Sequence, residues 1–430
     1  MAFQRIERKI IDLMAPVGSF EALTGAIQGG ANSVYFGVDK LNMRARSSGN
    51  FSIDDLNQIT DICRKHQVNS YLAINIVLYD DELDRMKEIV NKARQCGVNA
   101  VIASDHSVIS YAHATGMEVH ISTQVNISNF DALKYYAQYA DVIVLARELN
   151  LQQVKNIYLQ TLKNKVTGPS GRPVKLEMFV HGALCMSVSG KCYLSLHEHN
   201  RSANRGACLQ DCRRAYIVKE KETGMELDID NEHIMSPKDL CTIHFLDKII
   251  ETGVRVLKIE GRARSPEYVN TVVSCYNEAL NSIVEGSYSA EKIDNWKLRL
   301  SAVFNRGFWD GYYLGQKLGE WSNVYGSKAL RRKVYAAKGM NYFSRLKVAE
   351  FLCEAEKLKV GDEIIITGPT TGVIYMKIKE IRVNLKQVHE TVQGERFSIP
   401  VNETIRRSDK LYKWIKTNAL QNDSADYGEL

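Results

Sequence analysis

Short apolar runs alternate with longer amphipathic stretches through the first three quarters of the chain. Short runs rich in β-branched residues are typical of buried strands, and the stretches between them have the period of amphipathic helices. Eight such strands are predicted, at residues 10–15, 33–37, 70–77, 100–104, 118–123, 142–146, 175–181 and 254–260. The alternation predicts a parallel α/β sheet, and eight units predict a closed (β/α)8 barrel of the TIM type.

One connection is far longer than the others, because residues 182–253 lie between the seventh and the eighth predicted strands. Loops of this length inside a compact domain are usually functional. Five of the nine cysteines lie in it, and we expect a hairpin at residues 215–230. Since barrel enzymes carry their chemistry at the carboxyl ends of the strands, this loop is the first candidate for a site.

The pattern changes near residue 330. Beyond it, strand-like runs alternate with turns that contain glycine, which predicts a small β-barrel domain. We therefore expect a TIM-like barrel domain at residues 1–330, a small basic β-barrel domain at 331–416 and a flexible tail at 417–430.

The chain has 430 residues and a net charge of +6, which is unevenly distributed. Residues 328–416 hold 19 Lys and Arg against 10 Asp and Glu, an excess of nine positive charges that leaves three negative charges for the remainder. Such a basic surface either serves solubility or binds a polyanion, with RNA foremost. The chain has no run of 18 apolar residues and no apolar segment behind a basic start, so we expect a cytoplasmic protein without a membrane partner.

The cysteines of the long loop are the strongest chemical signal. An odd number of cysteines in a chain without a secretion signal argues for reduced thiols rather than a disulfide framework. The five loop cysteines are separated by 6, 15, 3 and 28 residues, at Cys185, Cys192, Cys208, Cys212 and Cys241. Four thiolates suit an iron–sulfur cluster or a structural zinc ion, and spacing alone leaves both open, together with plain reduced thiols.

Several motifs carry a family resemblance. Residues 177–195 follow the pattern E-x-F-x-x-G-A-L-C-x4-G-x-C-x-L-S position for position, and further motifs occur at residues 42–45, 204–213, 236–241, 257–262 and 304–308. With these motifs, residues 10–325 resemble peptidase family U32, whose members were first named collagenase-like peptidases. Better understood relatives act in oxygen-independent or prephenate-linked hydroxylation of tRNA, ribosomal RNA and a quinone precursor.

The resemblance implies a 4Fe-4S cluster held by four cysteines. Matched to the motifs of this chain, the implied ligands are Cys185, Cys192, Cys208 and Cys241, with Cys212 as an alternative. The basic β module that follows the barrel is similar to that of the tRNA hydroxylation branch of the family. This implies an enzyme that forms 5-hydroxyuridine at the wobble position and binds the tRNA anticodon loop through the basic C-terminal domain.

Charged residues that follow the strands are candidate catalytic residues, namely Arg44, His181, Glu260 and Arg262. Arg46, Arg201 and Arg205 are expected at the same mouth, with Gln124 and Asn126 at the end of the fifth strand. The planar fork of an arginine binds carboxylates and phosphates, so prephenate, with two carboxylates, suits such a site as a co-substrate. Each arginine is equally explained by a surface ion pair, and Glu260 either acts as acid or base or holds Arg262.

Aromatic residues interleave with cations near the domain junction, from Trp309 to Lys333. This strip either stacks on unpaired bases of an anticodon loop or packs between the domains. A collagenase-like peptidase is a weaker alternative, because the chain has neither an H-E-x-x-H nor a G-x-S-x-G motif. Hydroxylation of ribosomal RNA or of a quinone precursor, and a non-catalytic RNA-binding subunit, also remain open.

Overall fold

The computed structural model describes residues 7–45, 51–217, 221, 233–316, 319–324 and 326–417. Eight parallel strands form a closed barrel, because β9 (Val256–Ile259) pairs with both β1 (Asp12–Pro16) and β7 (Lys175–Gly182). The strands between them follow in sequence order: β2 (Ser33–Phe36), β3 (Asn69–Ile74), β4 (Ala100–Ala103), β5 (Glu118–Ile121) and β6 (Val142–Val144). The predicted barrel is confirmed, and each predicted strand corresponds to one of these eight.

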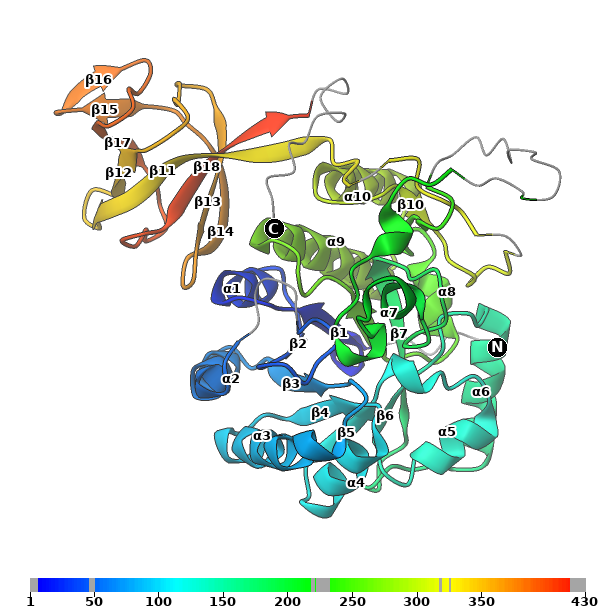
Figure 1. Cartoon of the computed structure of the whole chain (residues 1–430). Coiled ribbons are helices and arrows are strands. Elements are labelled where there is room, and N and C mark those ends of the chain that lie inside the picture. Colours follow the sequence, from blue (N-terminus) through cyan, green and yellow to red (C-terminus); the bar gives the residue numbers. More distant parts are fainter. Residues whose placement is uncertain are drawn as a thin grey trace.

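Helices cover the outside of the barrel (Figure 1). One helix follows each strand, and their bounds are α1 (Phe20–Gln28), α2 (Leu56–Lys65), α3 (Leu83–Cys96), α4 (His106–Ala114), α5 (Phe130–Tyr136), α6 (Leu151–Lys163), α8 (Leu246–Glu251) and α9 (Pro266–Glu285). A further helix, α10 (Ala290–Ala302), packs on α9. The main apolar core lies between the strands and these helices, as the alternating sequence pattern requires.

The long connection between β7 and β9 contains α7 (Leu194–His199), β8 (Asp239–Cys241) and α8. Strand β8 runs antiparallel to the end of β7, with Cys241 opposite His181. Strand β10 (Phe308–Trp309) pairs with β8. The connection is therefore anchored at the carboxyl end of β7, which is the mouth of the barrel.

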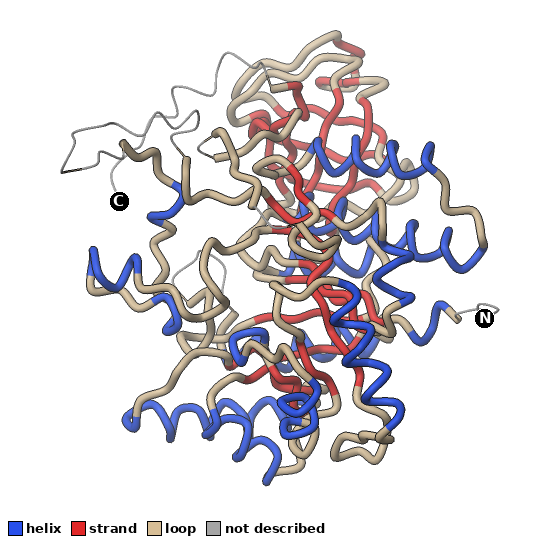
Figure 2. Tube along the Cα trace, turned by 90° about the vertical axis from the view of Figure 1, so that its right-hand side faces the viewer, coloured by secondary structure: helices blue, strands red, loops and turns tan. Residues whose placement is uncertain are grey.

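The C-terminal strands form a second, antiparallel sheet with its own apolar core. Figure 2 shows these strands as a separate group above those of the barrel. From one edge to the other the order is β14 (Gly372–Lys377), β13 (Glu363–Gly368), β18 (Lys410–Lys416), β11 (Arg331–Phe343), β12 (Val348–Cys353), β17 (Arg396–Pro400), β15 (Ile381–Val383) and β16 (Lys386–Val388). This sheet provides the predicted C-terminal β structure.

The two parts of the chain meet where α1 contacts β14. At the end of α1, the Gln28 side chain donates from Nε2 to the Thr371 carbonyl (2.9 Å) and accepts at Oε1 from the Val373 backbone N–H (2.9 Å). Gly372 lies between these two residues with φ +68°, and a Cβ atom there would lie 2.3 Å from the Gln28 side chain. Glycine is thus required both for the turn and for the close approach.

Two predictions fall largely or wholly outside the described residues. The tail at 417–430 is described only at Thr417, and the hairpin expected at residues 215–230 is described only at 215–217 and 221. Among the helices that the structure describes, none is long and apolar enough to cross a membrane.

The Gln28 contact predicts local destabilisation on mutation. Gln28→Ala removes both hydrogen bonds to the β14 end, and we expect a loss of about 1–2 kcal/mol at this junction. Hydrogen exchange at the Val373 amide should become faster, while exchange in β12 stays unchanged. Gln152→Ala is the control, because the Gln152 side chain on α6 donates to Asn156 at an exposed position. Unchanged exchange at Val373 would contradict this role of Gln28.

Candidate functional site

A pocket of about 170 Å³ opens at the carboxyl ends of the barrel strands. Side chains from the strands form its floor, and the long connection between β7 and β9 forms much of its wall. The charged residues and the cysteines that line it are Arg44, Arg147, Arg213, Lys258, Glu260, Arg262, Cys185, Cys192, Cys208 and Cys212. We call this cavity the mouth pocket.

The floor of the mouth pocket rests on a buried ion pair. Lys258 on β9 lies with its Nζ 2.7 Å from Oε1 of Glu177 on β7, and both side chains are almost fully buried. Burial lowers the pKa of Lys258, although Glu177 opposes this shift. The Lys258 ammonium also lies 4.6 Å from the centre of the Tyr35 ring. Oε2 of Glu177 has no hydrogen-bond partner among the described residues.

A second ion pair spans the mouth. Nη2 of Arg44, which follows β2, lies 2.7 Å from Oε1 of Glu260, which follows β9. Burial by itself would raise the pKa of Glu260, but the surrounding arginines, Arg44 first among them, lower it to about 2. Glu260 is therefore a carboxylate at neutral pH, and it serves as an anchor for Arg44 rather than as a proton donor.

Three arginines of the mouth pocket, Arg147, Arg213 and Arg262, have no carboxylate at ion-pair distance within the described part of the chain. Arg213 instead donates to a hydroxyl and to two backbone carbonyls. Arg262 is buried and donates from Nη1 to Oδ1 of Asn42 (3.1 Å). Arg147 stacks over the Phe179 ring at 4.1 Å, and its buried Nε has no partner. Guanidinium groups without a carboxylate at ion-pair distance favour an anionic ligand, and carboxylates match their planar geometry.

Four of the five loop cysteines line the mouth pocket, namely Cys185, Cys192, Cys208 and Cys212. The fifth, Cys241, is 2% exposed and lies on β8. Its thiol contacts the Tyr276 hydroxyl on α9, outside the barrel wall. The structure thus brings Cys212, the alternative ligand, together with three of the implied ligands, and places Cys241 apart from them.

The donor set of the mouth pocket fits an iron–sulfur cluster. Burial raises the pKa of Cys208 and Cys212, and the neighbouring cysteine thiols raise it further. These thiols therefore share one neighbourhood at the barrel mouth, and four cysteine thiolates are the donor set that an iron–sulfur cluster uses. Among the residues that the structure describes, however, no three His, Cys, Asp or Glu side chains are grouped closely enough to hold a metal ion.

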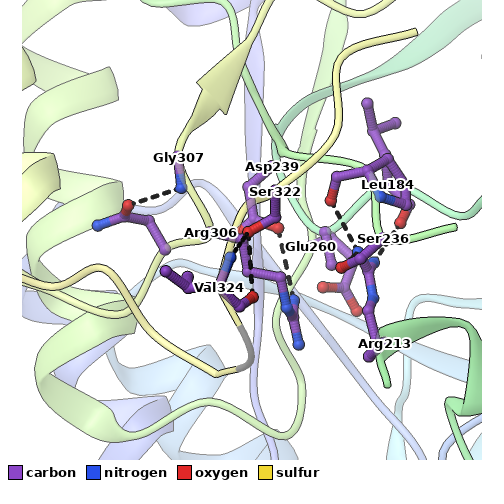
Figure 3. Close-up of polar contacts among 12 residues, drawn as sticks. Leu184, Arg213, Ser236, Asp239, Glu260, Arg306, Gly307, Ser322 and Val324 are labelled. Carbon is purple, nitrogen blue, oxygen red and sulfur yellow. Dashed lines mark hydrogen bonds and ion pairs between the residues drawn. The ribbon is translucent and has the colours of Figure 1, made fainter. Parts of the chain in front are cut away.

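Hydrogen bonds hold the cysteine connection against the barrel. Asn126, in the left-handed conformation after β5, donates from Nδ2 to the Ser189 carbonyl (3.1 Å). Arg213 donates to the carbonyls of Leu184 (2.6 Å) and Pro237 (2.7 Å), as well as to the Ser236 hydroxyl (Figure 3). Cys185 directly follows Leu184, and Cys212 directly precedes Arg213. The hydrogen bond between Arg213 and Leu184 therefore fixes the two cysteines relative to each other.

Of the four predicted catalytic residues, Arg44, Glu260 and Arg262 line the mouth pocket, whereas His181 does not. The His181 ring packs between Tyr276 and Phe308, and burial lowers its pKa to about 3. A β-bulge between Phe179 and His181 turns the histidine away from the inner face that Phe179 occupies. His181 is therefore a neutral packing residue.

The other residues expected at the mouth divide into several groups. Gln124 lines the mouth pocket, and Asn126 holds the loop. Arg205 pairs with Glu82 (2.8 Å) and ties the connection to the segment after β3, whereas Arg201 is exposed and does not line the pocket. Arg46 lies outside the described residues.

The aromatic strip predicted at 309–333 does not form one surface. Trp309 and Tyr313 are buried, and the Tyr313 hydroxyl donates to the Phe179 carbonyl (2.8 Å). Lys333 pairs with Glu267 of α9. Packing thus explains these members of the strip, and Tyr325 lies outside the described residues.

Comparison with known proteins places this chain in a family. The family model described as peptidase family U32 matches residues 18–323. The chain belongs to peptidase family U32. Three relatives of this U32 protein have names that describe different activities.

A protein of Porphyromonas gingivalis named collagenase is 58% identical over 405 residues, which are 94% of this chain and 98% of that protein. A tRNA hydroxylation protein of Bacillus subtilis is 30% identical over 375 residues, 85% of each chain. A 23S rRNA 5-hydroxycytidine synthase of Escherichia coli is 32% identical over 276 residues, 64% of this U32 chain and 40% of that enzyme.

Sequence reasoning missed Lys258, Glu177 and Arg147 as residues of this U32 site. A usable signal existed for the first, because Lys258, Glu260 and Arg262 alternate with other residues at the end of one strand. Residues two apart on a strand point to the same face, and charges on the inner face of a barrel meet at its mouth. Arg147 follows β6 without any such pattern.

The buried ion pair predicts strong coupling between two positions. Glu177→Gln leaves the Lys258 charge buried without a carboxylate and should lower the free energy of unfolding by about 3–5 kcal/mol. The double variant Glu177→Gln, Lys258→Met should cost clearly less than the sum of the single changes, because neither charge is then stranded. Urea unfolding of the four proteins measures this. Additive effects would show that the two side chains do not stabilise each other.

Proposed function

We propose that this protein is an iron–sulfur enzyme that hydroxylates a base in RNA, most directly the wobble uridine of tRNA to 5-hydroxyuridine. The observation that carries the proposal is the meeting of four cysteines with Arg147 and Arg262 at one barrel mouth. A redox-capable donor set beside an anion site suits a reaction in which an organic acid and a base are brought together. The names of the tRNA and ribosomal RNA relatives support an RNA substrate.

In this proposal, Cys185, Cys192, Cys208 and Cys212 hold a 4Fe-4S cluster, which supplies electron transfer when bound. Arg147 and Arg262 bind the carboxylates of a small organic co-substrate, for which prephenate has the required two carboxylates. Arg44 lines the same pocket and is held in place by Glu260. The protein's own contribution is thus to orient anions beside the thiols.

The basic C-terminal part supports tRNA as the partner. The excess of nine positive charges belongs to residues 328–416, and the sheet that they form is joined to the barrel through α1 and α9. Phosphate contacts by such a surface give affinity without sequence preference, and the barrel mouth then selects the base. We propose that this part holds the anticodon stem and loop while the uridine enters the mouth pocket.

Peptidase activity is the second candidate, because relatives at 58% and 53% identity are named collagenase. Ser195, His199 and Asp211 do lie together, but both Ser195 Oγ (2.9 Å) and His199 Nε2 (3.2 Å) contact the Asp211 carboxylate. In a serine peptidase the histidine must accept the proton of the serine hydroxyl. Here the buried serine donates to the aspartate instead, so the geometry favours a structural role.

The proposed reaction predicts a change in cellular nucleosides. A strain that lacks this protein should lose 5-hydroxyuridine derivatives from tRNA, and the wild-type gene should restore them, as measured by mass spectrometry of digested tRNA and ribosomal RNA. Restoration by Cys192→Ser would point to a non-catalytic RNA-binding subunit. A loss confined to ribosomal RNA would replace the tRNA substrate, and unchanged RNA would sink the proposal in favour of a quinone precursor or a protein substrate.

The placement of the cysteines predicts which thiols hold iron. After anaerobic purification, Cys185→Ser and Cys212→Ser should lose most of the bound iron and of the visible absorption of a cluster, because each removes one of four ligands. Cys241→Ser should keep both, because its thiol faces Tyr276 outside the barrel wall. The opposite result, with iron lost from Cys241→Ser and kept in Cys212→Ser, would restore the ligand set that the family motifs imply. Cys353→Ser, in the second sheet, is the matched control.

A further inference from the structure

A second cavity, of about 470 Å³, lies beside the mouth pocket. The two cavities share several wall residues, among them Arg44, Cys208 and Glu260. We call the second one the arginine cavity, because five arginines line it: Arg44, Arg213, Arg214, Arg264 and Arg306. The function proposed above assigns no role to Arg214, Arg264 or Arg306.

The arginine cavity is built on an aromatic support. The Arg264 guanidinium stacks over the Phe304 ring at 3.5 Å, and Arg306 lies 5.1 Å from the same ring. Stacking occupies one face of Arg264 and leaves its N–H edge for an acceptor in the guanidinium plane. Within the described part of the chain, Arg264 has no carboxylate at ion-pair distance.

Two further arginines of the cavity each pair with an aspartate. Arg306 reaches Asp239 (3.5 Å), and Arg214 reaches Asp211 (3.1 Å). Figure 3 shows Arg306 directed at Asp239, with Arg213 on the other side of Glu260. Pairing from one side fixes an arginine and leaves its other N–H groups available to a ligand.

Charge in this cavity is not balanced. Among the described residues, three of the five arginines pair with a carboxylate, Arg44 with Glu260, Arg214 with Asp211 and Arg306 with Asp239, whereas Arg213 and Arg264 have none at ion-pair distance. Burial lowers the pKa of Arg264; Tyr268, Glu260 and Asp239 oppose this shift, and the nearby Arg306 adds to it. Like charges held at this proximity repel, so an anion that enters between them is stabilised.

We propose that the arginine cavity holds a phosphodiester group of the RNA strand, next to the nucleotide whose base enters the mouth pocket; this inference rests on the proposed function. A phosphodiester carries one negative charge and two free oxygens that match an arginine fork. The shared wall lets one nucleotide occupy both cavities, with its base in one and its neighbouring phosphate in the other. The cavity thereby sets which nucleotide of the loop presents its base.

Binding of a short RNA hairpin with an unpaired uridine in its loop tests this assignment. Arg264→Gln and Arg214→Gln should each weaken binding about tenfold, and the slope of log affinity against log salt should fall by about one for each. Arg64→Gln is the matched control. Like Arg214, Arg64 on α2 is exposed and pairs with an aspartate three residues earlier in the chain. The control variant should bind RNA like the wild type. Circular dichroism shows whether each variant is folded, and Arg214 is exposed enough for its change to be tolerated.

A neutral linkage in the RNA identifies the contact. With a methylphosphonate on one side of the uridine, wild-type protein should lose the same factor of about ten, and Arg264→Gln should lose nothing more. If both variants bind the unmodified hairpin as tightly as the wild type, the arginine cavity does not hold RNA, although RNA hydroxylation itself could stand. If inorganic phosphate binds the wild type and not Arg264→Gln while RNA affinity is unchanged, the cavity serves a small phosphorylated ligand, and the inference is overturned. If the wild type binds no RNA, the proposed function fails as well.

Discussion

The burial of charge inside a closed barrel is the constraint on which the site depends. Removing an ammonium and a carboxylate from water costs several kcal/mol each, so Lys258 and Glu177 are tolerated only as a close pair. Glu177 lies on β7 and Lys258 on β9, and these two strands form the seam that closes the barrel. The pair thus links the closure of the sheet to the position of the charges above it. Arg44 and Glu260 repeat the same arrangement at the mouth.

A carboxylate that is already paired with one cation of the site is not available to the next arginine above it. Glu177 is already engaged by Lys258, and Glu260 by Arg44, so no carboxylate of the described barrel is left for Arg147 or Arg262. The mouth is therefore biased toward anions before any ligand arrives. A neutral peptide would gain little from such a surface, whereas a nucleic acid or an organic acid would gain from every contact.

Much of the fold could be predicted from the sequence, and less of the site. The eight strands followed from apolar runs at regular intervals, because a buried parallel strand must be apolar on both faces. His181 was misplaced because strand alternation puts it on the same face as Phe179, and a bulge cannot be read from residue types. Residue types equally do not indicate which side of the barrel wall each cysteine faces. It depends on the antiparallel register of β8, which pairs Cys241 with His181 and turns its thiol toward α9.

The position of β9 in the chain determines the order in which the residues of the mouth are synthesised. Strand β9 alone closes the barrel, and it follows all of the cysteine-bearing connection. During synthesis the loop thiols therefore leave the ribosome before the strand that carries Lys258 and leads to Glu260 and Arg262. Until that strand is in place, the thiols stand at the rim of an open sheet, accessible from both sides. Closure of the barrel by β9 then places Lys258, Glu260 and Arg262 beside these thiols.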